Sequence, residues 1–259
     1  MKDLLRHTGQ RGWPLPSGPW VMAQRWHELL FAHWPVPRSA LRPLIPGGLE
    51  IDTRKGQAWL GVIPFRMSGV RLRGTPAMPG LSAFPELNVR TYVVCEGMPG
   101  VWFFSLDAGN ALAVAVARAW FHLPYFRARM QTRWNGEWIE YHSERTHTPA
   151  PAAELKMRYR GCGTEQMPER GTLAHWLTER YCLYAADARG EIYRGEIHHA
   201  PWKLRSAEAE IERNTMARAL GVELPSEEPL LYYAERQEVV VWRPKLVTGE
   251  ASSERLVCN

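Results

Sequence analysis

Lysine is scarce in this chain of 259 residues, although its net charge is positive. Only five of the 32 Lys and Arg residues are lysine, and the rest are arginine. Arginine does not form an imine, so a Schiff-base mechanism has at most five candidate nucleophiles. They are Lys2, Lys55, Lys156, Lys203 and Lys245.

Cysteine, long apolar runs and blocks of like charge are also lacking. The four cysteines lie tens of residues apart, without Cys-x-x-Cys spacing or the density of a disulfide scaffold. The longest apolar run, at about residues 111–121, is interrupted by Arg118 and is shorter than the ~18 residues that span a bilayer. The first residues lack the apolar core of a signal peptide. We therefore expect a cytoplasmic protein with reduced thiols and no membrane association.

Signals for nucleic acid, metals and cofactors are equally weak. The formal charge of +5 is spread along the chain, and most of the 12 tryptophans lie in apolar strand patterns that favour core packing over base stacking. There is no glycine-rich phosphate loop and no internal repeat. His198 and His199 are adjacent, so on a strand they face opposite ways and cannot both ligate one metal. We expect no nucleic-acid partner, no metal and no cofactor.

What the chain does have is an aromatic-rich, 45% hydrophobic composition that can bury a core. Residues 1–20 are rich in Pro and Gly and predict an extended arm, residues 21–245 a single domain, and residues 246–259 a loose tail. Strands are predicted at 25–36, 57–67, 84–95, 101–107, 126–134, 138–145, 154–160, 173–185 and 191–199. A short helix is predicted at 38–44, and two principal helices at 110–122 and 206–220. This pattern indicates an α+β domain built on a closed or strongly curled antiparallel sheet.

One strand carries an unusual set of polar side chains. In residues 84–93, Glu86, Asn88, Arg90 and Tyr92 share one face of a strand. Such a face is either exposed to solvent or, in a central barrel strand, points into the lumen as a polar pocket. The Cα atoms of Glu86 and Arg90 are about 13 Å apart on a strand, so each group needs another partner.

Six segments resemble those of a known family. Residues 30–34, 84–93, 101–108, 121–125, 177–181 and 197–202 look like DUF2071, a YqjF-like family of uncharacterised proteins, in order over roughly residues 20–220. That family is similar, more distantly, to acetoacetate decarboxylase, whose fold is a β-barrel-like α+β domain around an active-site cavity. The resemblance implies such a barrel with an internal cavity, and it favours the lumen interpretation of Glu86.

The resemblance also exposes a departure from the decarboxylases. Those enzymes carry their imine-forming lysine just after a proline in the strand that follows a buried helix. Here Pro124 is followed by Tyr125, Phe126 and Arg127. We therefore do not expect lysine-dependent acetoacetate decarboxylation. Lys203, beside the family-like residues 197–202, is the one lysine near a matching segment and the alternative nucleophile.

The remaining polar residues suggest roles in a small-molecule site. Arg90 offers a planar fork for a carboxylate, and Glu86 is a candidate acid or base if burial raises its pKa. Tyr125 is a candidate donor to a developing oxyanion. Asn88, Tyr92 and Ser105 are further candidate lining residues.

Two charged residues near the predicted helix at 110–122 have alternative roles. Asp107 either lines the site or caps that helix. Arg118 either binds ligand or pairs with a carboxylate such as Glu86 or Asp107.

Three functions remain open. The first is an enzyme with lyase-like chemistry on a carboxylate- or ketone-bearing substrate, with Glu86 as acid or base. The second is a non-catalytic ligand-binding or sensor protein on the same fold. The third is an interaction module that uses the arm at residues 1–20. A small-molecule ligand is the expected partner, and a homo-oligomer is left open.

Overall fold

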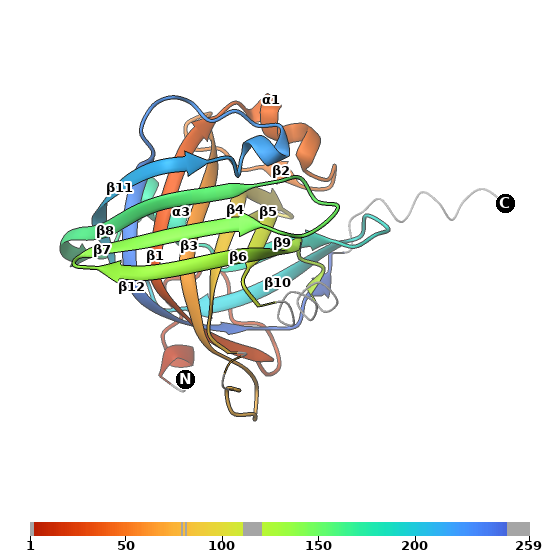
Figure 1. Ribbon diagram of the computed structural model, residues 1–259. Helices are drawn as coiled ribbons and strands as arrows, with labels where there is room; N and C mark the ends of the chain where they lie inside the picture. The colour runs from red at the N-terminus through yellow and green to blue at the C-terminus, as the bar shows by residue number, and fades with distance from the viewer. Residues whose placement is uncertain (1–2, 79, 81, 111–120, 248–259) are drawn as a thin grey trace.

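A computed structural model describes residues 3–78, 80, 82–110 and 121–247, and this part of the chain is mostly β-structure with few helices (Figure 1). The described strands are β1 Met22–Val36, β2 Glu50–Ile51, β3 Ala58–Leu72, β4 Phe84–Cys95, β5 Met98–Ala108, β6 Tyr125–Asn135, β7 Trp138–Arg145, β8 Glu154–Gln166, β9 Cys182–Ala186, β10 Ile192–His199, β11 Leu204–Asn214, β12 Leu230–Val241 and β13 Lys245–Leu246. The described helices are η1 Leu4–Arg6, α1 Arg38–Leu41, η2 Arg42–Leu44, α3 Leu173–Thr178 and η3 Arg218–Leu220. None of them is long and apolar enough to cross a membrane.

The hairpin of β4 and β5 is the element that the sequence predicts most clearly. Glu96 and Gly97 link the strands and both have positive φ, at 51° and 72°, as a tight two-residue hairpin turn requires. Their register pairs Cys95 with Met98 at the turn and Glu86 with Ala108 at the far end. The predicted pairing of these two strands is confirmed.

The strand pairings form a closed circuit. From β1 they run through β3, β4, β5, β9, β10 and β12 and return to β1. The pairing of β5 with β9 is parallel, and the other pairings in this circuit are antiparallel. One hydrophobic cluster lies inside, with Phe31, Phe65 and Trp202 among its members.

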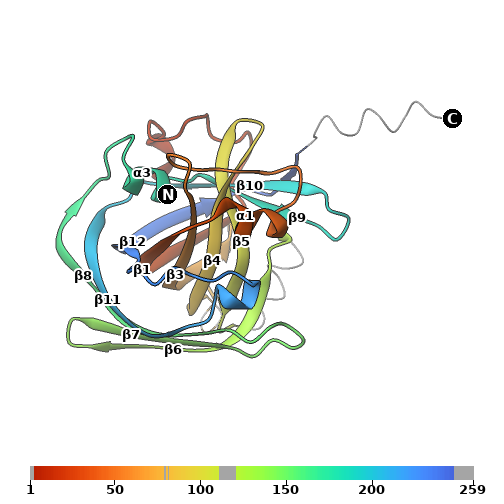
Figure 2. The ribbon, with the colours of Figure 1, turned by 90° about the horizontal axis from the view of Figure 1, so that it is seen from above.

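The remaining long strands form a second wall. In Figure 2, β6, β7, β8 and β11 curve as an outer layer around β1, β3 and β4. A second hydrophobic cluster contains Leu87 and Val89 of β4 together with Tyr141 of β7 and Met157 of β8. Strand β4 is therefore buried on both faces, with a polar face toward the first circuit and an apolar face toward the outer layer.

The arm packs against β10. Arg11 is buried, and its guanidinium donates to Glu196 Oε2 at 2.7 Å and to the Ile197 carbonyl at 2.5 Å. Gln10 donates to the His199 carbonyl. Near the C-terminal end of the described chain, β13 also pairs with β10. Leu246, at the start of the predicted tail, therefore belongs to a short strand.

The predicted helix at 206–220 is wrong. Most of that segment belongs to strand β11, because its residues alternate: Ala207, Ala209 and Ile211 pack against the second hydrophobic cluster. Between them, Glu208 and Glu210 are exposed and pair with arginines of β8. Ala and Glu favour a helix locally, but a period of two buries the apolar residues on one side of a sheet.

Two other predicted elements differ from the structure. The strand expected at 173–185 is divided into helix α3, with Thr172 as its N-cap, and strand β9. The helix expected at 110–122 lies largely on residues 111–120, outside the described residues. Within the described chain the longest helix is α3, of six residues, so two principal helices are not found there.

Candidate functional site

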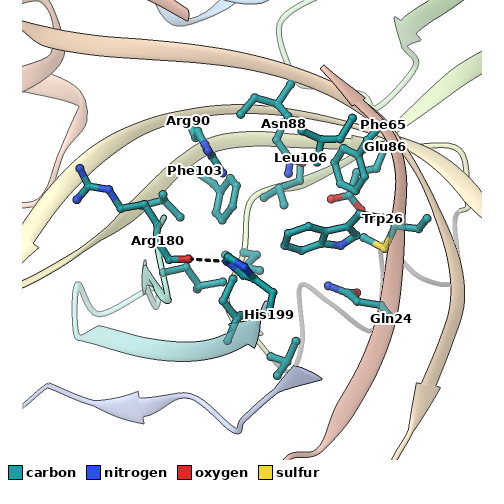
Figure 3. A pocket seen from close by; sticks show the side chains of 18 of the residues that line it. Gln24, Trp26, Phe65, Glu86, Asn88, Arg90, Phe103, Leu106, Arg180 and His199 are labelled. Atoms are coloured by element: carbon teal, nitrogen blue, oxygen red, sulfur yellow. Dashed lines mark hydrogen bonds between the residues drawn. The ribbon is translucent and has the colours of Figure 1, made fainter. Parts of the chain in front are cut away.

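A cavity of about 170 Å³ lies inside the closed circuit of strands (Figure 3). Its described lining comes from all seven strands of the circuit and is mainly apolar and aromatic. An aromatic cluster forms part of it: Trp26 stacks on Trp202 with centroids 6.0 Å apart, and Phe65 and Phe31 meet these rings edge-on. Polar side chains are few in this lining, so each polar group there has a large effect on what the cavity binds.

Glu86 lies in this cavity and is 1% exposed. Its carboxyl group accepts a hydrogen bond from the Tyr125 hydroxyl, at 3.1 Å, and one from Asn88. The pKa of Glu86 is raised to about 8, chiefly by burial and to a smaller extent by the charge of Asp107, although both hydrogen bonds oppose the shift. Glu86 is therefore largely protonated near neutral pH and can donate a proton to a ligand.

Arg90 is half-buried and lines the same cavity four residues along β4. Its Nη2 donates to the Leu177 carbonyl at 3.2 Å, and its Nε has no hydrogen-bond partner. Among the described residues, no carboxylate forms an ion pair with it. The cation is thus available for an anion from outside the chain.

Asn88 and Tyr125 complete the polar part of the site. Asn88 lies between Glu86 and Arg90 on the cavity face of β4, and its buried Oδ1 has no hydrogen-bond partner. Tyr125 lines the cavity from the start of β6, and burial together with Glu86 raises its pKa well above the ordinary value. Its hydroxyl therefore stays protonated and serves as the donor to Glu86.

Ser105 is not brought to the cavity, in contrast to the expectation. The pairing register skips Phe104, which makes a β-bulge in β5. Val101, Phe103 and Leu106 consequently face the cavity. The Ser105 hydroxyl instead donates to Asp107 on the opposite face of β5.

Tyr92 also lies outside the described lining, although it follows Arg90 on the same face of β4. It is fully buried beneath α3, where its ring is 4.7 Å from that of Trp176. Its hydroxyl donates to the Leu177 carbonyl at 2.8 Å and lies 2.6 Å from His33 Nε2. These bonds fix the contact between α3 and β4.

Asp107 is the acceptor of a buried double hydrogen bond from Arg145, at 2.6 and 2.8 Å. The negative charge of Asp107 is therefore paired with Arg145. Asp107 is not among the described residues that line the cavity. Arg118, the partner that the sequence analysis considers for Asp107, lies outside the described residues. The register places Asp107 opposite Leu87, directly beside Glu86, which is how its charge reaches that carboxyl group.

Several lining residues escape the sequence analysis. Gln24 and Trp26 of β1 line the cavity, but so do Leu29 and Phe31, which have the opposite parity. The change accompanies a register shift against β3 between His27 and Ala32, a stretch in which Glu28 has a φ of 53°. No sequence signal marks this register shift, so alternation alone could not assign the inward residues of β1.

His199 faces Glu86 and Arg90 from β10, as Figure 3 shows, whereas His198 contacts the arm at the Leu4 carbonyl. The opposite facing of the two histidines is as expected from a strand. Burial lowers the pKa of His199 to about 4, so its ring is neutral near pH 7. Its Nδ1 lies 2.7 Å from the Ala200 carbonyl and its Nε2 lies 3.3 Å from the Arg180 carbonyl, so the neutral ring can donate to one of these two acceptors.

No lysine occurs in the described lining of the cavity. Four of the five lysines are described, and all four are exposed: Lys55, Lys156, Lys203 and Lys245. The position after Pro124 is occupied by Tyr125, which faces the cavity.

This arrangement of strands is that of the acetoacetate decarboxylase-like fold. The enduracididine biosynthesis enzyme MppR complexed with pyruvate has a TM-score of 0.62 at 12% identity, with 92% of this chain and 93% of that chain covered. Acetoacetate decarboxylase from Legionella pneumophila has a TM-score of 0.61 at 11% identity, with 96% of each chain covered. At these identities the likeness concerns the fold alone.

Sequence relatives place the chain more narrowly. It belongs to the DUF2071 family, described as an uncharacterized conserved protein, which matches residues 23–238. The uncharacterized protein YqjF of Bacillus subtilis (strain 168) is 48% identical over 233 residues, which are 90% of this chain and 95% of that protein. The resemblance inferred from the six sequence segments is confirmed.

Proposed function

We propose that the closed circuit of strands is a β-barrel whose interior binds a small oxygenated ligand with a carboxylate or a ketone group, and that the protein acts on this ligand as an enzyme. The observation that carries the proposal is Arg90, a cation without a carboxylate partner among the described residues, in the same cavity as the protonated carboxyl group of Glu86. An anion bound next to this half-buried guanidinium would form charge-assisted hydrogen bonds with it. The MppR enzyme of the same fold, complexed with pyruvate, supports a small keto acid as one candidate.

The chemistry proposed is lyase-like and does not use an imine. Arg90 would hold the carboxylate, and Glu86 would give its proton to a ligand oxygen as negative charge develops there. Tyr125 would support Glu86 through its hydrogen bond to Oε2. The described lining lacks the lysine that an imine requires, which is why the lysine-dependent reaction is not proposed.

The same missing lysine favours a second function, a non-catalytic ligand-binding or sensor protein. In that case the cavity retains its anion-binding arginine and its apolar wall, and the ligand leaves unchanged. The two functions differ in what happens to the ligand, not in where it binds.

A thermal-shift screen of small carboxylic acids, keto acids and ketones tests the site. We expect compounds that raise the melting temperature of the wild type and fail to do so for Glu86→Gln or Arg90→Ala. Glu144→Gln and Arg129→Ala remove an exposed ion pair of β6 and β7 and serve as matched controls that keep the shift. Hits of equal size in all five proteins would place the ligand elsewhere.

Turnover then separates the two functions. Each hit is incubated with wild type and Glu86→Gln and followed by NMR. Consumption by the wild type alone supports the enzyme, whereas quantitative recovery from both proteins supports the binding protein.

A further inference from the structure

Among the residues that line the cavity, most of the buried polar atoms without a hydrogen-bond partner are donors. The described lining residues carry four buried donors without a hydrogen-bond partner: Arg90 Nε, Arg180 Nη2 and the indole Nε1 atoms of Trp26 and Trp202. Among the described lining residues, the buried acceptor without a hydrogen-bond partner is Asn88 Oδ1. Buried indole N–H groups normally find a partner, so the excess of donors calls for a ligand rich in acceptors. A carboxylate fits this requirement, whereas an amine or a polyol brings further donors.

The positive charge that the described lining offers can balance one negative charge on a ligand. Arg180 also lines the cavity, but its guanidinium donates to Asp52 at 2.7 Å and points away from the interior in Figure 3. Among the described residues of the lining, Arg90 is the remaining arginine, and its charge is available to a ligand. A monoanion balances this charge, whereas a dianion would be left with one charge uncompensated in an apolar cavity.

The size of the cavity limits the rest of the ligand. Its volume of about 170 Å³ is close to that of an apolar protein cavity of about 150 Å³ known to bind benzene. The rings of Trp26, Phe65 and Trp202 supply aromatic contacts to a body of that size. A ligand as small as acetate would leave most of this wall without contact.

We infer that the preferred ligand is a monocarboxylate with a compact apolar body about as large as a benzene ring, with its carboxylate at Arg90 and its apolar body on the aromatic wall of Trp26, Phe65 and Trp202. This inference rests on the proposed function and narrows its ligand class. It separates such compounds from the short keto acids and from polar or doubly charged acids.

Titration calorimetry with six probes tests the inference: benzoate, phenylacetate, acetate, pyruvate, the neutral benzamide and the dianion phthalate. We expect benzoate or phenylacetate to bind at least tenfold more tightly than acetate and pyruvate. Benzamide should bind at least tenfold more weakly than benzoate, and phthalate more weakly than both aromatic monoanions.

Two variants separate the carboxylate from the apolar body. Arg90→Met should reduce the affinity for benzoate to that for benzamide, and Arg129→Met is the matched control on an exposed arginine. Phe103→Ala should enlarge the cavity and move the preference from benzoate to the larger 2-naphthoate. If Arg90→Met does not fold, Arg90→Gln replaces it, and the ratio of benzoate to benzamide affinity in the wild type remains informative.

The contrary outcomes are distinct. Arg90-dependent binding of pyruvate or acetate as tight as that of benzoate overturns the inference and leaves the proposed function standing. Binding of benzoate that does not respond to Arg90→Met overturns the inferred placement of the carboxylate. Binding of none of the carboxylates overturns the inference, and a thermal-shift screen in which the ketones also fail overturns the proposed function as well.

Discussion

At the scale of single residues, Glu86 links the cavity to the stability of the fold. Its pKa is about 8 in the folded protein, against an ordinary value of 4.5. Between these pH values the folded protein keeps a proton that the unfolded chain has released. The stabilising contribution is therefore fully present below pH 4.5 and is lost as the pH rises through about 8, by up to about 1.4 kcal/mol per pH unit.

His199 acts in the opposite direction. Its pKa is lowered from 6.5 to about 4, so below pH 6.5 the unfolded chain binds a proton that the folded protein does not. Its contribution is present above pH 6.5 and is lost as the pH falls toward 4. The two effects oppose each other between pH 4.5 and 6.5, and of these two groups Glu86 acts alone between 6.5 and 8.

We therefore predict that Glu86→Gln removes a decline in the free energy of unfolding between pH 6.5 and pH 8. Urea denaturation of wild type and variant at four pH values across this window measures the difference. Glu144→Gln changes a half-exposed carboxylate and should keep the decline. Parallel curves for wild type and Glu86→Gln would show that Glu86 titrates at its ordinary pKa.

At the scale of secondary-structure elements, the contact between β5 and β9 beside Gly100 leaves no room for a side chain. A Cβ atom added at Gly100 would lie 2.7 Å from Cys182 Sγ, 2.7 Å from the Tyr184 ring and 2.9 Å from the Cys182 carbonyl. These distances are shorter than van der Waals contact, and the carbonyl belongs to the backbone of β9. The parallel pairing of Val101 with Leu183 follows directly on this contact.

We expect Gly100→Ala to lower the free energy of unfolding by about 1 to 3 kcal/mol, the usual cost of overpacking a buried site. Gly47→Ala, where a Cβ atom meets nothing within 4 Å, is the matched control. Chemical denaturation of both variants measures the effect. Equal midpoints for the two would indicate that β5 and β9 separate at little cost.

The elements also show why alternation predicts part of the site and misses the rest. Strand β4 is regular from Glu86 to Arg90, so the period of two places both side chains with Asn88 in the cavity. Strands β1 and β5 contain bulges, and each bulge moves the following residues to the other face. For this reason alternation predicts Ser105 in the cavity, whereas the register of β5 places it on the opposite face.

At the scale of the whole molecule, the arm is held to the body by a buried ion pair. The Arg11 side chain is fully buried and lies 2.7 Å from Glu196, whose side chain is 12% exposed. The same arginine packs against the Tyr181 ring at 5.2 Å. Through the Ile197 carbonyl it contacts the strand that also carries His199.

Replacing Arg11 by Met should destabilise the protein by up to about 3 kcal/mol, because Glu196 would lose its partner at 2.7 Å and keep only Arg194, at 3.7 Å. Arg6→Met breaks an exposed pair with Asp3 and should change stability by less than about 1 kcal/mol. Denaturation midpoints of the two variants test the difference. A small effect of Arg11→Met would mean that the arm contributes little to the fold.

The sequence by itself determined the regular hairpin of β4 and β5, the polar face of β4 and the family, because a period of two and a tight turn are properties of a few neighbouring residues. Only the tertiary structure decided that 206–214 is a strand, since its local preference for helix yields to burial against the outer layer. It also decided which residues of β1 and β5 face the cavity. Bulges and strand pairings across the chain set those directions, and they depend on residues far apart in the sequence.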